Sequence, residues 1–478
     1  MAQHFINGQW VAASNGQTLP VIDPSTGEVF ETLARGNATD IDKAVAAARA
    51  ALSGPWGRLT ATERGRILSK MSQIMLERVD ALALLESRDT GKPISQARND
   101  IIVSARYCEF YGGAADKVHG QQIPYLNDFH VVVLREPYGV TAHILPWNYP
   151  AQMFGRSVVP SLAMGNAAVL KPSEDACLTP LAFCDIAREA GLPDGALNVV
   201  TGLGEEAGAA LTGHHDIDFV TFTGSPEVGT LVQKAAANRT LKCVLELGGK
   251  SPQIVFEDAD LDRAATFVLK AITQNGGQTC SAGSRLLVQR SIYDRFVGQV
   301  VERFKQSSAG APAMDRDCGP LINADQKKRV EGFIKRAVDS GIAVLAQGTV
   351  ADGVPVGGFY VAPTLFGAVP RDHQLACEEV FGPVLAVIPF DDEEDAIALA
   401  NATDFGLLAG IWTRDGGRQI RMAKRMQCGQ VYINCYGAGG GVELPFGGVK
   451  RSGHGREKGF MALEEFCNVK TVVQYHGE

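Results

Sequence analysis

The sequence predicts an α/β protein with two parallel-sheet domains and a small β arm. Its 478 residues are too many for one ordinary hydrophobic core, so two or more domains are expected. Short apolar runs alternate with helical patterns over residues 139–247 and again over 252–433. Apolar strands joined by helices form parallel sheets covered on both faces, and ligands bind at the carboxyl ends of such strands.

The region before residue 118 is rich in helical patterns. The apolar run 44–48 follows the capping candidates Thr39 and Asp40, and amphipathic stretches cover 62–87 and 95–117. Strands of the first sheet are expected at 140–145, 167–170, 197–200, 219–222 and 243–245, and strands of the second sheet at 285–288, 343–345 and 384–388.

Two strand-like segments, 129–134 and 469–473, belong obviously to neither series. Apolar strands without a home sheet are candidates for pairing across subunits. A local hairpin within one chain is the alternative. Both interpretations place these segments outside the two main sheets.

The composition is that of a soluble globular protein and excludes several classes of function. A net charge of −8 leaves no basic excess for a nucleic-acid surface. No apolar run approaches the ~20 residues of a membrane span, and residues 1–7 do not resemble a secretory signal. The ten cysteines form no Cys-x-x-Cys pair and do not cluster with the nine histidines. We therefore expect no metal site, no disulfide framework and a cytoplasmic location.

Two glycine-rich turns, 246–250 and 276–281, carry the strongest chemical signal. A thiolate at Cys280 can attack an electrophilic carbon, and a carboxylate at Glu246 can then activate water to release the product. Polar neighbours and nearby glycines favour an accessible thiol at Cys280. The alternatives are an inert buried thiol and a glutamate that only caps a turn.

The loop that follows the first predicted sheet strand is fixed by Pro146 and Pro150. Between them, Asn148 can present its side-chain N–H toward an oxyanion. An Asx turn before the second proline is the alternative.

Glycines and a charged pair after the next strands indicate a nucleotide site. The turn 222–229 joins a strand to a helix, where backbone N–H groups can bind phosphate. Its spacing is not the usual dinucleotide fingerprint, and the run 202–208 misses that fingerprint by one residue. Lys171 and Glu174 can hold ribose hydroxyls, and a carboxylate there favours NAD over NADP. A helix start capped by Ser173 is the alternative.

Taken together, these motifs follow the order seen in the aldehyde dehydrogenase superfamily, which the chain resembles over nearly its whole length. The matching segments are 146–148, 171–174, 222–225, 246–250, 277–280, 379–383 and 445–450. The resemblance implies a homodimer or homotetramer built from three parts. These are a Rossmann-like NAD-binding domain (1–118 and 138–248), a catalytic domain (249–450) and an oligomerisation arm (119–137 and 459–478).

The resemblance also implies the roles of individual residues. Cys280 would attack the aldehyde, Asn148 and the Cys280 backbone N–H would hold the oxyanion, and Glu246 would activate water to hydrolyse the thioester. Relatives that transfer the acyl group to coenzyme A typically lack this glutamate, so a free acid is the expected product. NAD would accept the hydride, with NADP as an alternative. The residues expected around the cofactor are Ile144, Pro146, Trp147, Lys171, Ser173, Glu174, Gly204, Gly208, Phe222, Gly224, Ser225, Gly229, Leu247, Gly248, Glu379 and Phe381.

By the same resemblance, the substrate pocket would include Tyr149, Met153, Arg156 and Phe446, with the loop 437–446. Arg156 stands where semialdehyde and some aromatic-aldehyde relatives also carry arginine. It can pair with a substrate carboxylate or with a neighbouring acid of the protein. Relatives specific for succinic semialdehyde usually have a second arginine where this chain has Gln274, which weakens that assignment.

Two other classes of function compete with an aldehyde oxidoreductase. A thiol hydrolase or acyltransferase would use Cys280 and Glu246 but would leave Lys171, Glu174 and the Gly224 turn without a purpose. A catalytically silent relative would be expected to lack Cys280, Glu246 or Asn148, and all three are present.

Overall fold

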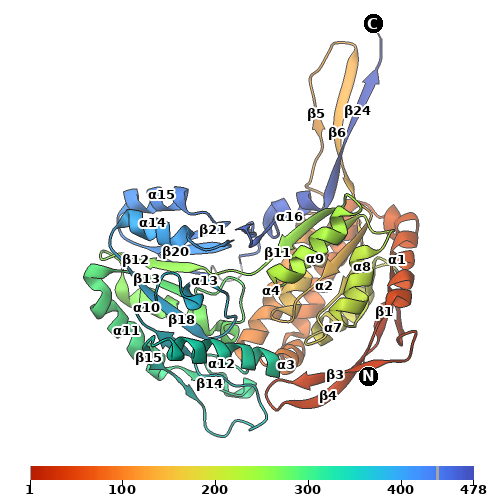
Figure 1. Cartoon of the computed structure of the whole chain (residues 1–478). Helices are drawn as coiled ribbons and strands as arrows, with labels where there is room; N and C mark the ends of the chain where they lie inside the picture. The colour runs from red at the N-terminus through yellow and green to blue at the C-terminus, as the bar shows by residue number, and fades with distance from the viewer. Residues whose placement is uncertain (1, 438–440, 478) are drawn as a thin grey trace.

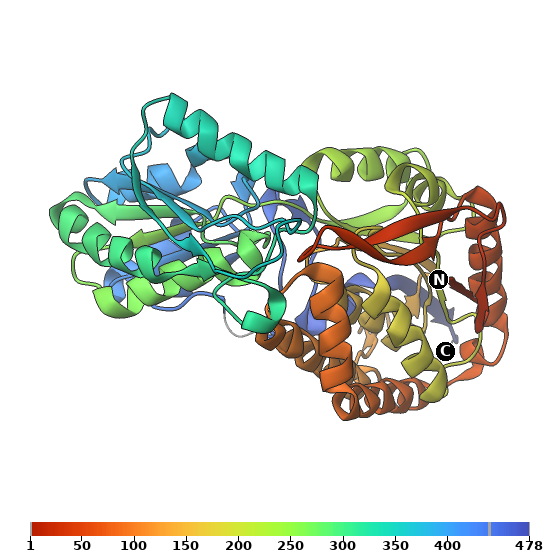
Figure 2. The same cartoon turned by 90° about the horizontal axis from the view of Figure 1, so that it is seen from below.

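The computed structural model describes residues 2–437 and 441–477. It contains two large sheets with their helices and a narrow β arm that projects from one end, with the C-terminus at its tip (Figure 1). Seen from below, the sheets and helices form two lobes (Figure 2). The α/β fold class with two sheets and an arm is thereby confirmed.

The first sheet is parallel in its centre and antiparallel at both edges. In spatial order its strands are β2 (Gln9–Val11), β1 (His4–Ile6), β9 (Leu197–Val199), β8 (Ala167–Lys171), β7 (Val140–Ile144), β10 (Phe219–Thr223), β11 (Lys242–Glu246) and β23 (Gly453–His454). Every residue of β7, β8 and β10 is buried, which agrees with the short, mainly apolar segments that predicted these strands.

Helices pack around this sheet and share one hydrophobic core with it. They are α1 (Ala38–Ser53), α2 (Ala61–Glu77), α3 (Val79–Thr90), α4 (Ile94–Ala114), α5 (Pro150–Met153), α6 (Val159–Ala163), α7 (Leu178–Glu189), α8 (Ala209–Gly213), α9 (Pro226–Ala237) and α16 (Gly459–Glu465).

The N-terminal region differs from the prediction in three details. The cap of α1 is Asn37, whose side chain accepts the N–H of Thr39, so the predicted caps Thr39 and Asp40 lie inside the helix. The stretch 62–87 is broken at Arg78, which ends α2 and begins α3. Four strands were missed because they are short or half-exposed: β1, β2, β3 (Thr18–Asp23) and β4 (Glu28–Ala34).

The second sheet is parallel except for its edge strand β15. In spatial order its strands are β15 (Val344–Gln347), β17 (Thr364–Phe366), β18 (Val384–Phe390), β13 (Arg285–Gln289), β12 (Pro252–Val255), β20 (Leu408–Trp412) and β21 (Gln430–Ile433). Alternate strand residues, such as Ile254 and Val255, belong to different hydrophobic clusters, one on each face. One face is covered by α12 (Ala324–Asp339), α14 (Glu393–Asn401) and α15 (Gly416–Arg425), and the other by α10 (Leu261–Thr273) and α11 (Tyr293–Gln306).

The two leftover segments pair with each other in the arm. β6 (Phe129–Pro137) and β24 (Cys467–Tyr475) are antiparallel over their whole length, with the short β5 (Gln121–Gln122) on the other side of β6. Pairing within one chain is therefore what this structure shows. α16 packs on the first hydrophobic core and also contacts the arm, where Arg135 Nη2 of β6 lies 3.5 Å from Glu464 Oε1. The domain boundaries given above stay a prediction.

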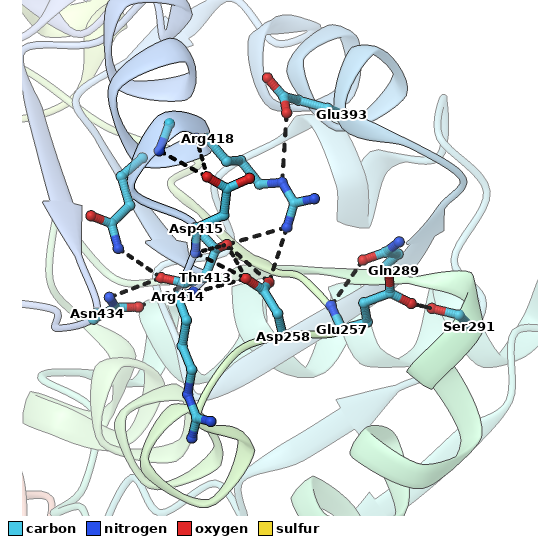
Figure 3. Close-up of polar contacts among 12 residues, drawn as sticks. Glu257, Asp258, Gln289, Ser291, Glu393, Thr413, Arg414, Asp415, Arg418 and Asn434 are labelled. Carbon is cyan, nitrogen blue, oxygen red and sulfur yellow. Dashed lines mark hydrogen bonds and ion pairs between the residues drawn. The ribbon is translucent and has the colours of Figure 1, made fainter.

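The chain order reverses in the second sheet between β12 and β20, where ligands of such sheets commonly bind. Here Asp258, three residues after β12, fills that position. Its carboxylate accepts hydrogen bonds from the Thr413 hydroxyl, the N–H groups of Arg414 and Asp415 (both 3.0 Å) and the Arg418 guanidinium (3.0 Å) (Figure 3). These hydrogen bonds connect the segment that follows β12 to the segment that follows β20.

We expect Asp258→Asn to lower the free energy of unfolding at neutral pH by about 2 kcal/mol, because several donors lose a charged acceptor. Burial would raise the pKa of Asp258, but the hydrogen bonds and Arg418 outweigh it and lower the pKa. The ionised carboxylate therefore stabilises the fold above its unfolded pKa, and that stabilisation is lost as the pH falls through the folded pKa. Thermal denaturation across the acid range should show the difference from wild type shrinking below about pH 4.

The neighbouring Glu257→Gln is the control for this experiment. Its exposed carboxylate accepts one hydrogen bond from Ser291 (2.8 Å), and surface changes of this kind usually stay within about 0.5 kcal/mol. Equal Tm losses in the two variants at every pH would contradict the role of Asp258 in connecting these two segments.

Candidate active site

Cys280 lies in a tight loop between α10 and β13, and its side chain is partly exposed. Before it, Asn275 (φ 50°), Gly276 (φ 62°) and Gly277 (φ 72°) have positive φ angles, which place them on the left-handed side of the backbone map. A Cβ on Gly277 would stand 2.2 Å from the carbonyl oxygen of Gly382, so only glycine fits there. The loop is thus held close to the backbone that precedes β18.

The loop after β7 is hydrogen-bonded to the Cys280 loop. Asn148 Nδ2 donates to the carbonyl of Gln278 (2.9 Å), and Asn275 Nδ2 donates to the carbonyl of Asn148 (2.8 Å). Among the described residues Asn148 Oδ1 has no hydrogen-bond partner, so the Asx-turn alternative is wrong. The amide nitrogen carries two hydrogens, and the bond to Gln278 uses one of them.

Glu246 is the last residue of β11 and is 2% exposed. Neither of its carboxylate oxygens has a hydrogen-bond partner among the described residues, although Arg156 Nη2 lies 3.4 Å from Oε2. Burial raises the pKa of Glu246 well above its usual value; the charge of Arg156 opposes this shift and that of Glu457 adds to it. A carboxyl group with a raised pKa is a stronger base toward water.

Burial also raises the pKa of the Cys280 thiol, to about 11, an effect that Arg156 opposes and that Glu246 and Glu379 reinforce. The thiol is therefore neutral in this state, and its proton has to be removed as the sulfur attacks. Glu246 lines the same cavity as Cys280 and is a base that can receive it.

Two cavities meet at Cys280. The smaller has a volume of about 250 Å³, and the larger has a volume of about 850 Å³. Among the described residues only Asn148 and Cys280 line both. A reacting atom placed between these two side chains is consequently reachable from both sides.

The larger cavity fits a dinucleotide in size and lining. It opens at the ends of β10 and β11, beside the start of α9, which Ser225 caps by accepting the N–H of Val228. The buried hydroxyl of Thr223 faces the cavity without a hydrogen-bond partner among the described residues. Of the residues predicted to surround the cofactor, the cavity collects Pro146, Trp147, Gly224, Ser225, Leu247, Gly248, Glu379 and Phe381.

Several of these residues are fixed by contacts of their own. The rings of Trp147 and Phe381 pack edge to face, with centroids 5.3 Å apart. Glu379 Oε1 accepts the N–H of Gly249 (2.9 Å), and burial raises the pKa of Glu379 to about 7. The N–H of Gly224 donates to the carbonyl of Glu246 (3.0 Å), so it is engaged within the protein.

A second group of predicted cofactor residues lies at the carboxyl end of β8. Lys171 Nζ is 2.6 Å from Glu174 Oε2, and the N–H of Gly204 donates to Glu174 Oε1 (3.4 Å). Ile144 pairs in register with both Lys171 and Phe222, which brings three strand ends together.

The remaining predicted cofactor residues take less direct positions. Ser173 does not cap a helix: α7 starts at Leu178, and Ser173 Oγ accepts the N–H of Asp175 (3.3 Å). Gly208 lies beside the Lys171 side chain, and Gly229 packs on Leu247, where a Cβ would stand 2.5 Å from Leu247 Cδ2.

The smaller cavity contains all four predicted substrate residues, Tyr149, Met153, Arg156 and Phe446. Arg156 is engaged by the protein itself: Nε donates to Glu457, Nη2 faces Glu246, and the guanidinium lies 4.1 Å from the Phe446 ring centroid. The ion pair with a neighbouring acid is therefore present. Residues 438–440 of the predicted pocket loop lie outside the described residues.

Comparison with known proteins decides the family. The model of the aldehyde dehydrogenase family matches residues 10–472. The chain belongs to the aldehyde dehydrogenase family. Aldehyde oxidation with NAD, through a catalytic cysteine, is the activity of this enzyme.

Relatives of this dehydrogenase cover its whole length. It is 42% identical to the mitochondrial benzaldehyde dehydrogenase of Antirrhinum majus, over 98% of this chain and 88% of the relative. A crystal structure of a Burkholderia cenocepacia protein, provisionally described as an aldehyde dehydrogenase, is 57% identical, with a TM-score of 0.99 and 100% of both chains covered. Betaine aldehyde dehydrogenase of Staphylococcus aureus in complex with NAD+ is 35% identical, with a TM-score of 0.96, over 100% of this chain and 95% of that one.

Sequence reasoning missed several residues at the dehydrogenase's site, among them Thr223 and Tyr432, and it missed the acid that holds Arg156. Glu457 is 2% exposed and holds Arg156. The sequence did offer one indication of a special role for Glu457. It lies in the charged run 456–458 between Gly455 and Gly459, and such a glycine-flanked run is not typical of a surface helix. Within residues 2–437 and 441–477, no group of three or more potential ligands is arranged for a metal ion, and no helix has the length and apolarity to cross a membrane.

Proposed function

We propose that Cys280 is the catalytic cysteine and that the aldehyde carbon reacts between Cys280 and Asn148. The observation that carries this proposal is that only these two described side chains line both cavities. The sulfur forms a bond to the aldehyde carbon while the thiol proton passes to Glu246. The second N–H of the Asn148 amide donates to the resulting oxyanion. NAD, when bound, supplies the acceptor for the hydride that leaves this carbon.

The adduct that remains on Cys280 is a thioester, which water must cleave. Glu246 first gives the thiol proton up to solvent and then removes a proton from the attacking water. The water oxygen bonds to the acyl carbon, the carbon–sulfur bond breaks to release a carboxylic acid, and the proton on Glu246 returns to the Cys280 sulfur. The raised pKa of Glu246 and its two unbonded oxygens support this role. Trp147, Glu379 and Phe381 would hold the nicotinamide end of the cofactor, and Lys171 and Glu174 its adenosine ribose.

We propose an uncharged aromatic aldehyde as the substrate, in preference to a semialdehyde. Arg156 already pairs with two acids, so it has no unbalanced charge to offer a substrate carboxylate. The smaller cavity is lined by the rings of Tyr149, Tyr432 and Phe446, which suit a flat apolar group. The similarity to a benzaldehyde dehydrogenase supports the same class.

A panel of aldehydes with wild type and Arg156→Met tests this assignment. We expect wild type to reduce NAD faster with benzaldehydes than with carboxylate-bearing semialdehydes. Arg156→Met should lose about tenfold or more in kcat/KM on both classes alike, because it acts through the protein's own acids. Without the arginine the pKa of Glu246 rises further, so the acidic limb of the rate profile should move to higher pH.

Arg64→Met is the matched control, since Arg64 is a partly buried arginine that donates to the backbone carbonyls of Leu59 and Ala163. It should leave the pH profile unchanged. A loss confined to the carboxylate-bearing aldehydes in Arg156→Met would overturn the assignment and restore carboxylate recognition.

We also propose a homodimer or homotetramer in the cytoplasm. The exposed apolar side chains of β24, Val469, Val473 and Tyr475, support association, and ten free cysteines suit a reducing compartment. Light scattering during size-exclusion chromatography measures the oligomeric state, and a monomer would contradict the proposed association. Cell fractionation tests the cytoplasmic location, and recovery of the enzyme in another compartment would contradict it.

A further inference from the structure

A lysine is buried behind the wall of the smaller cavity. Lys92 lies in the loop between α3 and α4, and its side chain is 0% exposed. Its Nζ donates to Asp100 Oδ2 (2.5 Å) and to Glu86 Oε1 (3.3 Å). Apolar side chains of similar size would often stabilise the fold as well as such a buried ion pair does. A charge kept here therefore points to a role beyond stability.

The ammonium group faces the ring of Tyr149. Lys92 Nζ lies 4.1 Å from the ring centroid, within the range of a cation–π interaction. At the other end of the same side chain, a hydrogen bond of 2.8 Å joins the Tyr149 hydroxyl to Thr279 Oγ1. Thr279 directly precedes Cys280, and Tyr149 directly follows Asn148. The Tyr149 side chain thus links the buried Lys92 ammonium to the chain neighbours of Cys280 and Asn148, the two residues that line both cavities.

The cluster around Lys92 reaches the site by two further contacts. Asp100 Oδ1 accepts a hydrogen bond from Nε2 of Gln152, a residue of the smaller cavity (2.6 Å). One turn earlier on α4, Gln96 Oε1 accepts the N–H of Asn275 in the Cys280 loop (2.9 Å). The start of α4 therefore braces both the cavity wall and the loop that carries the nucleophile.

We propose that Lys92 is a positioning residue for aldehyde oxidation. Its ammonium, clamped by Asp100 and Glu86, holds the Tyr149 ring in place, and Tyr149 holds Thr279 so that the Cys280 sulfur points into the gap between the cavities. Lys92 is not among the described residues that line either cavity, so it acts through Tyr149 and not on the substrate. The proposal rests on the proposed role of Cys280 as nucleophile.

A double-mutant cycle tests the coupling between the two side chains. Lys92→Met keeps most of the volume but removes the charge, and we expect kcat/KM for the aldehyde to fall about tenfold or more, as small misplacements of reacting groups can do. The KM for NAD should stay unchanged, because Lys92 and Tyr149 lie outside the described lining of the larger cavity. In a Tyr149→Leu background the same lysine change should cost much less, since the ring it holds is gone.

Three further measurements separate positioning from folding. Lys92→Arg keeps a cation and should recover part of the lost activity, and Lys92→Met should also slow alkylation of Cys280 by iodoacetamide. If Lys92→Met does not fold, Lys92→Met combined with Asp100→Asn removes the closer ion pair and leaves Glu86, whose pKa is raised by burial. This double variant should fold with the same loss in kcat/KM. Trp56→Phe, a change in the same core away from the site, is the control that lowers Tm without altering kcat/KM.

Equal losses from Lys92→Met with and without Tyr149 would overturn the proposal, as would a fall in Tm with kcat/KM unchanged. Failure of the proposed nucleophile looks different, since Cys280→Ser would then remain active. The two ideas can therefore fail separately.

Discussion

Cys280→Ser is expected to lower kcat/KM for aldehydes by more than about 10³-fold, while NAD still binds. A serine hydroxyl is far harder to deprotonate than a thiol, and no hydride can be transferred without the covalent adduct. The absorbance of the reduced nicotinamide measures the loss, and quenching of protein fluorescence by NAD shows that the larger cavity is intact.

Cys435→Ser is the control for this experiment, because Cys435 is also partly exposed and lies outside the described lining of the cavities. It should retain wild-type activity. Aldehyde oxidation that persists in Cys280→Ser would show that Cys280 is not the nucleophile. An equal loss of activity in Cys435→Ser would show that the effect is not specific to Cys280.

Glu246→Gln is expected to separate the two halves of the reaction. The first turnover should still produce one equivalent of reduced nicotinamide per active site, although more slowly than in wild type, because the thiol has lost the base that receives its proton. Steady-state turnover should fall about 10²- to 10⁴-fold, the usual contribution of a general base. Rapid mixing measures the burst, and mass spectrometry should detect the acyl group on Cys280.

The control for this second prediction is Glu189→Gln, an exposed acid that pairs with Arg78. It should show neither effect. If steady-state turnover of Glu246→Gln equals that of wild type, Glu246 is not the base. If coenzyme A accelerates turnover in wild type, the acyl group is passed to a thiol and not to water.

The sequence predicted the sheets well because most central strands are buried on both faces and are mainly apolar, as in β8 and β10. It missed the short strand β1, because three residues are too few to show a period. Caps were placed wrongly where several polar residues compete, as Asn37 and Thr39 do before α1.

The site was predictable to the extent that its residues stand at strand ends or in glycine turns. Asn148, Glu246 and Cys280 follow that pattern, and the structure places all three at the larger cavity. The partners of Arg156 could not be predicted, because Arg156 and Glu457 are 301 residues apart and nothing local links them. The ion pair of Lys92 with Asp100 is close in sequence, but its contact with Tyr149 depends on how α4 packs.

Because only Asn148 and Cys280 among the described residues separate the two cavities, the aldehyde and NAD would each occupy a cavity of its own. A compound that plugs the aldehyde entrance should compete with aldehyde while leaving NAD free to bind, and a compound lodged in the nucleotide entrance should do the reverse. An inhibitor that occupies both cavities would have to pass beside the Cys280 sulfur. A thiol-reactive group in the linker between its two halves could therefore bond to that sulfur.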